Sequence, residues 1–367
     1  MDVHVDRMKE LGDARTTRIH EGWVPAYAEA ALESLYECPM STLLRFRQYY
    51  SLDDAATYVS SDGGVPRAVI VFRVERDTLR VYNEQIAIPA GELERFARAA
   101  FVHYPQLRRI SLYAVDACTD GLAFPHQKLR CLEDITLPLP ESLARYDAML
   151  SKNMSSKIKR SNKKLLSDFA CVRTNVAGPR EAGAKLVERI IGFNRMRMAV
   201  KRQACYHNDG ETAKLVEMVE RFGRVCTVSL NGELSAGMIM LRIGATISMH
   251  TIAHHPRYDK YNLGTLCCYY GIAHAIETGA RRFGFGWGRN EYKYRLLGEH
   301  KDLHRIDIYR TPLAMAADLP TLCRHRLHAR RRDFKQWMAH PGPGDGEVAK
   351  SLRRTLHAVR ALRDSFR

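Results

Sequence analysis

A short stretch around His250 contains residue types that could carry out proton transfer. His250 lies in the middle of the predicted strand 247–253, where alternation places Ser248, His250 and Ile252 on one face. A histidine has a free pKa of about 6.5, so it can accept a proton from an amine near neutral pH. We interpret His250 as a candidate general base. The alternative is a hydrogen-bonded core histidine.

The loop after this strand has the composition of a phosphate-binding site. Arg257 and Lys260 supply positive charge, and the backbone amides of residues 263–265 open a predicted helix. Unpaired N–H groups and the dipole at a helix N-terminus favour anions, and N–H groups at the strand end could polarise a carbonyl. The alternative is a surface loop that starts a helix. The candidate cofactor-binding residues are Ile252, Ala253, His254, Arg257, Lys260, Leu263, Gly264 and Thr265.

A glycine-rich segment and two polar residues follow the predicted helix. In residues 283–288, alternation places three aromatic residues on one face and three glycines on the other, which permits close approach of a ligand or of another element. Tyr292 could donate a proton to a leaving group, and Lys293 could stabilise an oxyanion or bind an acidic group. A packed surface helix is the alternative. The candidate substrate residues are Trp287, Arg289, Glu291, Asn194 and His207.

The nine cysteines argue against a zinc site and against covalent catalysis. None forms a Cys-x-x-Cys pair or lies near a histidine at metal-ligand spacing, so we expect no metal. The N-terminus has no apolar core of a signal peptide, and no apolar run is long enough to span a membrane. Together with the scattered thiols, this predicts a cytoplasmic protein.

The formal net charge of +16 predicts an anionic partner. Candidates are CoA phosphates, nucleic acid, an acidic substrate and a membrane surface. Positive charge gathers in the predicted helix 152–164 and in residues 321–367. Both could be solvated helix faces. Alternatively, the helix could bind the CoA 3′-phosphate, a polyanionic acceptor or tRNA, and the tail could contact nucleic acid or a membrane.

Two stretches of the chain repeat one order of predicted elements. Each begins with a hairpin, at Asp62-Gly63 in the first and Asn231-Gly232 in the second, dipeptides that supply the positive φ of hairpin turns. A strand, a helix and a final strand then form a crossover, whose parallel strands can separate at their carboxyl ends into a cleft. The basic loop before the second helix has no counterpart in the first copy. We therefore predict that the second copy is catalytic and that the first is structural or shapes the substrate site.

The second copy resembles the GNAT acyltransferases of the BioF2-like type, which occur in bacterial polysaccharide and secondary-metabolite gene sets. It is also similar to the Fem-type peptidoglycan-bridge aminoacyltransferases, which contain two GNAT-like lobes. The resemblance covers residues 143–311 well and the first copy weakly. It rests on the basic helix, the Asn-Gly hairpin and a series of later positions, namely Tyr258 or Tyr261, Gly264, Gly286, Gly288, Tyr292-Lys293 and Leu297-Gly298.

This resemblance implies a mixed α/β (α+β) fold with two tandem GNAT-like lobes and a basic C-terminal helical tail. Residues 1–140 are expected to form a degenerate N-terminal lobe. Residues 141–320 are expected to form the catalytic lobe, with a helical insert at 145–224, and residues 321–367 the tail.

The implied function is acyl-CoA-dependent N-acyl transfer, directly to the amine of a small metabolite, amino acid or amino sugar. The phosphate loop departs from the usual Gln/Arg-x-x-Gly-x-Gly/Ala pattern, because Arg257 precedes the single Gly264 by seven residues. This departure and the Fem-type similarity give a first alternative, an aminoacyl-tRNA-dependent transferase. A second alternative is a non-catalytic nucleic-acid-binding protein on a GNAT scaffold.

Overall fold

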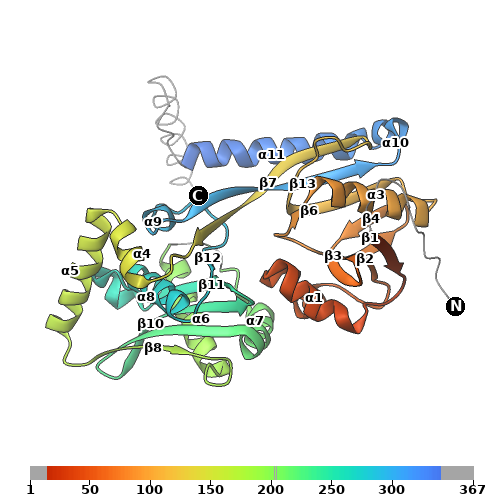
Figure 1. Cartoon of the computed structure of the whole chain (residues 1–367). Helices are drawn as coiled ribbons and strands as arrows, with labels where there is room; N and C mark the ends of the chain where they lie inside the picture. Colours follow the sequence, from red (N-terminus) through yellow and green to blue (C-terminus); the bar gives the residue numbers. More distant parts are fainter. Residues whose placement is uncertain (1–14, 202, 204, 340–367) are drawn as a thin grey trace.

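The computed structural model describes residues 15–339 apart from residues 202 and 204. In this part of the chain, two lobes lie side by side (Figure 1). Strands β7 (His126–Pro138) and β13 (Glu299–Tyr309) run from one lobe to the other, and helix α11 (Leu319–Ala339) lies along them. The sheet therefore continues from lobe to lobe.

Each lobe combines strands of this sheet with helices. The first lobe contains β1 (Arg15–His20), α1 (Ala26–Tyr36), η1 (Pro39–Ser41), α2 (Leu43–Tyr49), β2 (Ala56–Asp62), β3 (Val65–Glu75), β4 (Thr78–Val81), β5 (Ala87–Ile88), α3 (Ala90–His103) and β6 (Arg109–Ala117). The second contains α4 (Leu143–Met149), α5 (Lys152–Asp168), β8 (Val172–Ala177), α6 (Ala184–Val200), α7 (Asp209–Phe222), β9 (Gly223–Leu230), β10 (Glu233–Ile243), β11 (Thr246–His254), η2 (Pro256–Tyr261), α8 (Leu263–Glu277), β12 (Arg282–Gly284) and α9 (Glu291–Arg295). The short helix α10 (Pro312–Ala317) precedes α11.

The strand order shows the duplication directly. It runs β1-β2-β3-β4-β6-β13-β7-β12-β11-β10-β9-β8, so the first five strands mirror the last five about the central pair. Strand β7 follows β6 in the chain but pairs with β12, and β13 follows β12 but also pairs with β6. The two lobes have thus exchanged their final strands. The sequence repeat did not predict this exchange.

The predicted hairpins and crossovers are present in both lobes. Strands β4 and β6 are parallel, as are β11 and β12, and each pair is joined through a helix. The second hairpin turns at Asn231 and Gly232, both with positive φ. The first turns at Gly63 and Gly64, one residue later than expected, because these two glycines supply the positive φ at both positions. The predicted mixed α/β, two-lobe fold is confirmed.

Alternating apolar residues make a core on each face of the sheet in both lobes. In β3, Ile70 and Phe72 pack on the α3 side, whereas Val69 and Val71 pack on the side of α1 and α2. In β10, Met238 and Met240 pack on the side of α5 and α8, and Ile239 packs on the side of α6 and α7. This period of two is the pattern of strands that are covered on both faces.

The segment 145–224 contains the expected helices and one strand that the sequence analysis missed. Helix α5 is capped by Ser151, whose side chain accepts a hydrogen bond from the Met154 amide, and its buried positions recur at helical spacing. Strand β8 then pairs with β9 along its whole length and forms the outer edge of the sheet. Its residues from Val172 to Asn175 are largely exposed, so they lack the apolar signal of an internal strand.

The first half of the predicted basic tail is a helix that contacts the central strands. The Arg332 guanidinium pairs with Glu133 of β7, and Nε2 of Gln336 donates to the same carboxylate at 2.8 Å. Nδ1 of His325 lies 3.0 Å from Oδ2 of the buried Asp307 in β13. Helix α11 therefore has a structural role on β7 and β13. The second predicted helix of the tail lies outside the described residues.

No helix between residues 15 and 339 combines the length and apolar character needed to cross a bilayer.

Candidate active site

The two parallel strands of the second lobe separate after three residue pairs. Thr246, Ile247 and Ser248 of β11 pair with Arg282, Phe283 and Gly284 of β12, and the described ladder ends there. A Cβ on Gly284 would lie 3.2 Å from Oγ of Ser248, so glycine permits the close approach of the strands at this point. Beyond it, the edge of β11 from Met249 onward faces a gap between the strands. Such an opening is where ligands bind in folds of this kind.

His250 is the extra residue of a β-bulge. In the β10–β11 ladder, Ile239 pairs with Thr251 and Met240 pairs with Met249, so His250 has no opposite residue. The bulge changes the alternation of faces. Ile252 packs on the α8 side with Met249, and Ala253 packs on the side of α6 and α7. The prediction that His250 and Ile252 share a face is therefore wrong.

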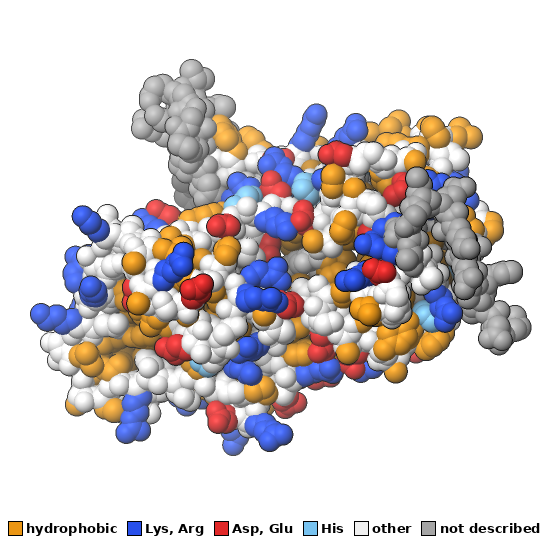
Figure 2. Space-filling view, in the orientation of Figure 1, with side chains coloured by type: hydrophobic (Ala, Val, Ile, Leu, Met, Phe, Trp, Pro, Cys, Tyr) orange, Lys and Arg blue, Asp and Glu red, His pale blue; other side chains and the backbone are white. Residues whose placement is uncertain are grey.

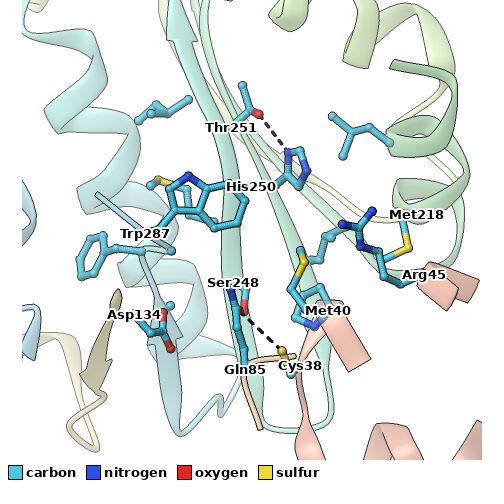
Figure 3. Close-up of a pocket in the computed structure, with 18 of the residues that line it drawn as sticks. Cys38, Met40, Arg45, Gln85, Asp134, Met218, Ser248, His250, Thr251 and Trp287 are labelled. Carbon is cyan, nitrogen blue, oxygen red and sulfur yellow. Dashed lines mark hydrogen bonds between the residues drawn. The ribbon is translucent and has the colours of Figure 1, made fainter. Parts of the chain in front are cut away.

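A cavity of about 540 Å³ lies at this gap, and both lobes line it. Figure 3 shows Ser248, His250 and Thr251 along β11, with Arg45, Met40 and Met218 on one side and Trp287 and Asp134 on the other. Seven of the predicted site residues line it: His250, Tyr292, Lys293, Ile252, Trp287, Asn194 and His207.

His250 and His207 are linked through the hydroxyl of Thr251. Nδ1 of His250 lies 3.0 Å from Oγ1 of Thr251, which lies 2.9 Å from Nε2 of His207. The side chain of His250 is open to the cavity, but desolvation by the surrounding protein, followed by the charges of His207 and Arg45, lowers its pKa to about 4. Burial also lowers the pKa of His207. Both rings are therefore neutral at pH 7 and can accept a proton.

Tyr292 presents a protonated hydroxyl to the cavity. Its ring is half-buried against the core under α8, and its hydroxyl makes no hydrogen bond within the described residues. Burial raises the pKa of Tyr292, so the proton stays on the oxygen at neutral pH. This arrangement suits a proton donor.

Lys293 has a different environment, with only 2% of the residue exposed. Its Nζ donates to the carbonyl oxygens of Gly286 at 3.0 Å and Trp287 at 2.5 Å. Burial lowers the pKa of Lys293 to about 8. The ammonium group therefore holds the chain that leaves β12.

The glycine-rich segment is not the continuous strand that its alternation predicts. Strand β12 ends at Gly284, and Gly286 and Gly288 have φ of 66° and 90°. Phe283 and Phe285 are buried and lie edge to face, whereas 55% of Trp287 is exposed. Two of the three glycines serve the positive φ of a turn, and only Gly284 serves close packing.

The predicted phosphate-binding residues extend from the end of β11 to the first turn of α8. Of these eight residues, only Ile252 lines the cavity. The Arg257 guanidinium pairs with Glu233 and lies 4.6 Å from the centre of the Tyr258 ring. Nζ of Lys260 lies 5.1 Å from the centre of the Tyr261 ring. Both cations therefore already have partners. Thr265 lies in the first turn of α8.

The backbone at the same place is more open. Asn262 has a left-handed φ of 55° and does not cap α8 with its side chain. A Cβ on Gly264 would meet only Nδ1 of His254, at 3.9 Å, and that nitrogen is buried without a described partner. The other ring nitrogen of His254 lies 2.7 Å from Asp259. The side chains of Ala253 and Leu263 are in the core, so only their backbone groups could bind a ligand.

Two predicted substrate residues are engaged elsewhere. Arg289 contacts His300 at 3.2 Å and Asp302 at 3.7 Å on β13. Glu291 pairs with Arg295 on the outer surface of α9 at 2.6 Å. Neither lines the cavity. By contrast, Asn194 of α6 does line it, and its Oδ1 accepts a hydrogen bond from Cys205 at 3.4 Å.

The sequence analysis missed the contribution of the first lobe to the cavity. That lobe supplies Glu37, Arg45, Tyr49 and Gln85, and the exchanged strand β7 supplies Asp134. Contacts between the lobes close this side, since Nε2 of Gln48 donates to the Lys214 carbonyl and Glu37 pairs with Arg282 at 3.2 Å. The polar residues between apolar ones in 37–50 could have marked this segment as part of a site. They do not indicate which segments of the second lobe they would meet.

Comparisons with known proteins agree with this geometry. Residues 152–294 match the model of the acetyltransferase (GNAT) domain family. A search of curated protein sequences found no match. Among solved structures, FemX aligns with a TM-score of 0.54 at 10% identity, covering 82% of this chain and 99% of its own. A protein of unknown function from Bacteroides thetaiotaomicron aligns with a TM-score of 0.52 at 12% identity, covering 80% and 100%.

The family match covers the separated strands, the bulge and α8, which are the parts that an acyl transfer site needs. The FemX alignment extends the likeness in fold over both lobes. The match to an enzyme family also favours catalysis over the non-catalytic alternative. Residues 152–294 thus match the acetyltransferase (GNAT) domain family, and the described chain has a two-lobed fold similar to that of FemX.

Proposed function

We propose that this enzyme moves an acyl group from an acyl-CoA directly to the amine of a small metabolite, amino acid or amino sugar. The observation that carries the proposal is the cavity of about 540 Å³ at the separation of β11 and β12. It is large enough for the reacting ends of two substrates, and part of its lining comes from residues 152–294, which match the GNAT domain family. Holding both reactants there removes much of the entropic barrier.

In this proposal, His250 takes the proton that the acceptor amine must lose. The neutral imidazole can accept it, and the contact through Thr251 to His207 offers a second site for the proton. The amine nitrogen then bonds to the acyl carbon and the carbon–sulfur bond breaks. Tyr292 donates its proton to the departing sulfur. The backbone N–H group of Ile252, the residue of this strand end that lines the cavity, stabilises the oxyanion.

Lys293 acts in this proposal as a positioning residue. Its two hydrogen bonds fix the backbone of Gly286 and Trp287, which lead from β12 toward Tyr292. Because the ammonium is almost fully buried and already bonded, we assign it no direct contact with the substrates.

At the start of α8, a CoA donor would be bound by backbone N–H groups and not by charged side chains. The uncapped helix start and the open space at Gly264 fit a phosphate of the CoA co-substrate. Such a donor and the nine free cysteines suit a reducing cytoplasm.

A second candidate donor is an aminoacyl-tRNA, and the surface of α5 favours it. Lys152, Lys159, Arg160, Lys163 and Lys164 are exposed, and basic side chains project from this edge of the molecule (Figure 2). The described residues contain no ion pair for any of these five. A polyanion could contact such a face through its phosphates.

Calorimetry and thermal unfolding with acetyl-CoA, longer acyl-CoAs and free CoA test the donor. A ligand at about 100 times its Kd stabilises the folded state by about 2.7 kcal/mol. We expect Gly264→Asp to abolish this shift, because it adds a carboxylate where the phosphate binds, in a space that accepts a Cβ.

Gly210→Asp is the matched control, since Gly210 is likewise the second residue of a helix, α7. It should retain CoA binding. If no CoA species binds to the unmodified protein, the acyl-CoA proposal is wrong. Binding of aminoacyl-tRNA in a gel-shift experiment would then favour the second candidate.

A further inference from the structure

We propose that the acceptor carries a carboxylate close to its amine, as amino acids do, and that Arg45 of the first lobe binds this carboxylate. The inference rests on the proposed acyl transfer to an amine and narrows the acceptor class. It starts from one side chain in the cavity whose charge has no partner within the described residues.

Arg45 lies on α2 and lines the cavity from the first lobe. Its side chain is half-buried, and its guanidinium carbon lies 3.2 Å from the centre of the Tyr49 ring. No carboxylate pairs with it, and no side-chain hydrogen bond from it is present in the described part of the chain. The stacked guanidinium therefore keeps its donors along its edge for a ligand.

The other cations that line the cavity are already satisfied. Arg282 pairs with Glu37 at 3.2 Å, and Nζ of Lys214 lies 3.0 Å from Oε1 of Glu211. Lys293 donates to two carbonyl oxygens. Among the described lining residues, Arg45 thus remains as the cation without an ion pair or a hydrogen bond from its guanidinium. A cation in a half-buried site favours an anionic ligand.

The position of the guanidinium is fixed by a hydrogen-bonded group beneath it. The Tyr49 hydroxyl donates to Glu211, and the Tyr206 hydroxyl donates to the same carboxylate oxygen at 2.8 Å. Nζ of Lys214 also lies 3.8 Å from the centre of the Tyr49 ring. The ring on which Arg45 stacks is therefore held by Glu211. A held, planar guanidinium suits two parallel hydrogen bonds to one carboxylate.

The opposite wall carries a carboxyl group of different character. Asp134 of β7 lines the cavity, and burial raises its pKa. It lies across β11 from Arg45 in Figure 3, and it forms no ion pair with Arg45. Asp134 therefore leaves the charge of Arg45 available to a ligand.

Arg45 lies on the same side of the cavity as the proposed base. His250 and Arg45 project into the space beside Met218 and Met40 (Figure 3). Arg45 is also close enough for its charge to act on the His250 ring. In an α-amino acid, one carbon separates the amine from the carboxylate. An acceptor held through its carboxylate by Arg45 therefore has its amine on the His250 side, where the proton is removed.

The test compares acceptors in pairs that differ only in the carboxylate. Binding to the full chain is measured by calorimetry without any donor, for α-amino acids and the matching decarboxylated amines: lysine with cadaverine, tyrosine with tyramine, histidine with histamine, and tryptophan with tryptamine. Release of CoA from acetyl-CoA is then followed with the same panel. We expect the amino acid of at least one pair to bind and react, and its amine to be at least 10-fold weaker.

Arg45→Gln should weaken binding of that amino acid by about 10- to 100-fold, the effect of losing charge-assisted hydrogen bonds. Arg45→Lys should recover only part of it, because a lysine cannot form the paired bonds. Arg47→Gln, on the same helix but exposed and outside the cavity, is the matched control and should bind normally.

Acetyl-CoA binding, measured separately, should be unchanged in Arg45→Gln, which also shows that this variant folds. The inference is overturned if no amino acid of the panel binds, if the decarboxylated amines bind equally well, or if Arg45→Gln weakens acetyl-CoA binding instead. Failure of acetyl-CoA to bind the unmodified protein counts against the proposed donor. In that case, the comparison of amino acids with their decarboxylated amines still tests whether Arg45 binds a carboxylate.

Discussion

His207 and His250 lie with their ring centres 5.7 Å apart, although His207 comes from the loop after α6 and His250 from a bulge in β11. The hydroxyl of Thr251 bridges them. Nδ1 of His207 is buried and has no partner within the described residues. In the proposed mechanism, the pair forms a short path along which a proton taken from the acceptor is shared.

Replacing His250 by glutamine should lower kcat for acyl transfer by about 10²- to 10³-fold, the usual contribution of a general base. The loss should shrink as the pH rises, because more of the acceptor amine is then already deprotonated. Steady-state rates between pH 6 and 9 measure this effect. His274→Gln, outside the cavity, is the control. An unchanged kcat in His250→Gln would remove His250 from the mechanism.

The stability of the protein should fall as the pH is lowered from about 6.5 toward 4. Desolvation by the cavity walls, His207 and Arg45 lower the pKa of His250 to about 4, and Glu211 acts in the opposite direction. In this range the unfolded chain therefore takes up a proton that the folded protein does not. Stability is fully present above pH 6.5 and declines below it. The lowered pKa of His207 adds to the decline.

Urea unfolding at pH 7, 6 and 5 measures this dependence. His250→Gln should flatten the slope by up to one proton, because glutamine does not titrate. A slope identical to that of the unmodified protein would show that His250 does not titrate with a lowered pKa.

Tyr292→Phe should lower kcat by about 10- to 100-fold and leave stability nearly unchanged, because the hydroxyl has no hydrogen-bond partner in the described structure. Tyr294→Phe, which alters an exposed tyrosine on the same helix, should have no effect on rate. Turnover with acetyl-CoA and with a thioester of a more acidic thiol distinguishes proton donation by Tyr292 from a purely structural role. A better leaving group needs less protonation, so the second substrate should be less sensitive to the change.

Lys293→Met should destabilise the folded protein by about 2–4 kcal/mol, since it leaves the carbonyl oxygens of Gly286 and Trp287 without their donor. Arg295→Met, on the exposed face of α9, should stay within about 0.5 kcal/mol. Urea unfolding measures both changes. If Lys293 instead contacted a substrate, the variant would lose activity and keep its stability.

Local patterns in the sequence predicted much of the fold. The Asn231-Gly232 turn, the alternation in β10 and the loop before α8 are local features, and each predicts its element. The bulge at His250 is also local, but it depends on the register with β10, which a single strand does not reveal. The predicted strand at β12 is too long. The sequence does not distinguish glycines that adopt a positive φ in a turn, such as Gly286 and Gly288, from a glycine that allows two strands to approach closely, such as Gly284.

The site was only half predictable. His250, Tyr292 and Lys293 stand next to recognisable motifs of the second lobe. Arg45 and Asp134 reach the same cavity from the first lobe and from β7, through contacts between segments far apart in the chain. Nothing in the residues around Arg45 indicates that Tyr49 will meet Glu211. Such contacts are fixed by tertiary packing and not by local propensity.

The exchange of β7 and β13 has a consequence for synthesis on the ribosome. The sheet of the first lobe is completed next to β6 by Glu299–Tyr309, which is translated long after the rest of that lobe. Until then, β6 has an unpaired edge that can join to another chain. A nascent chain therefore has to protect this edge during most of its elongation, and both lobes reach their final form at almost the same moment.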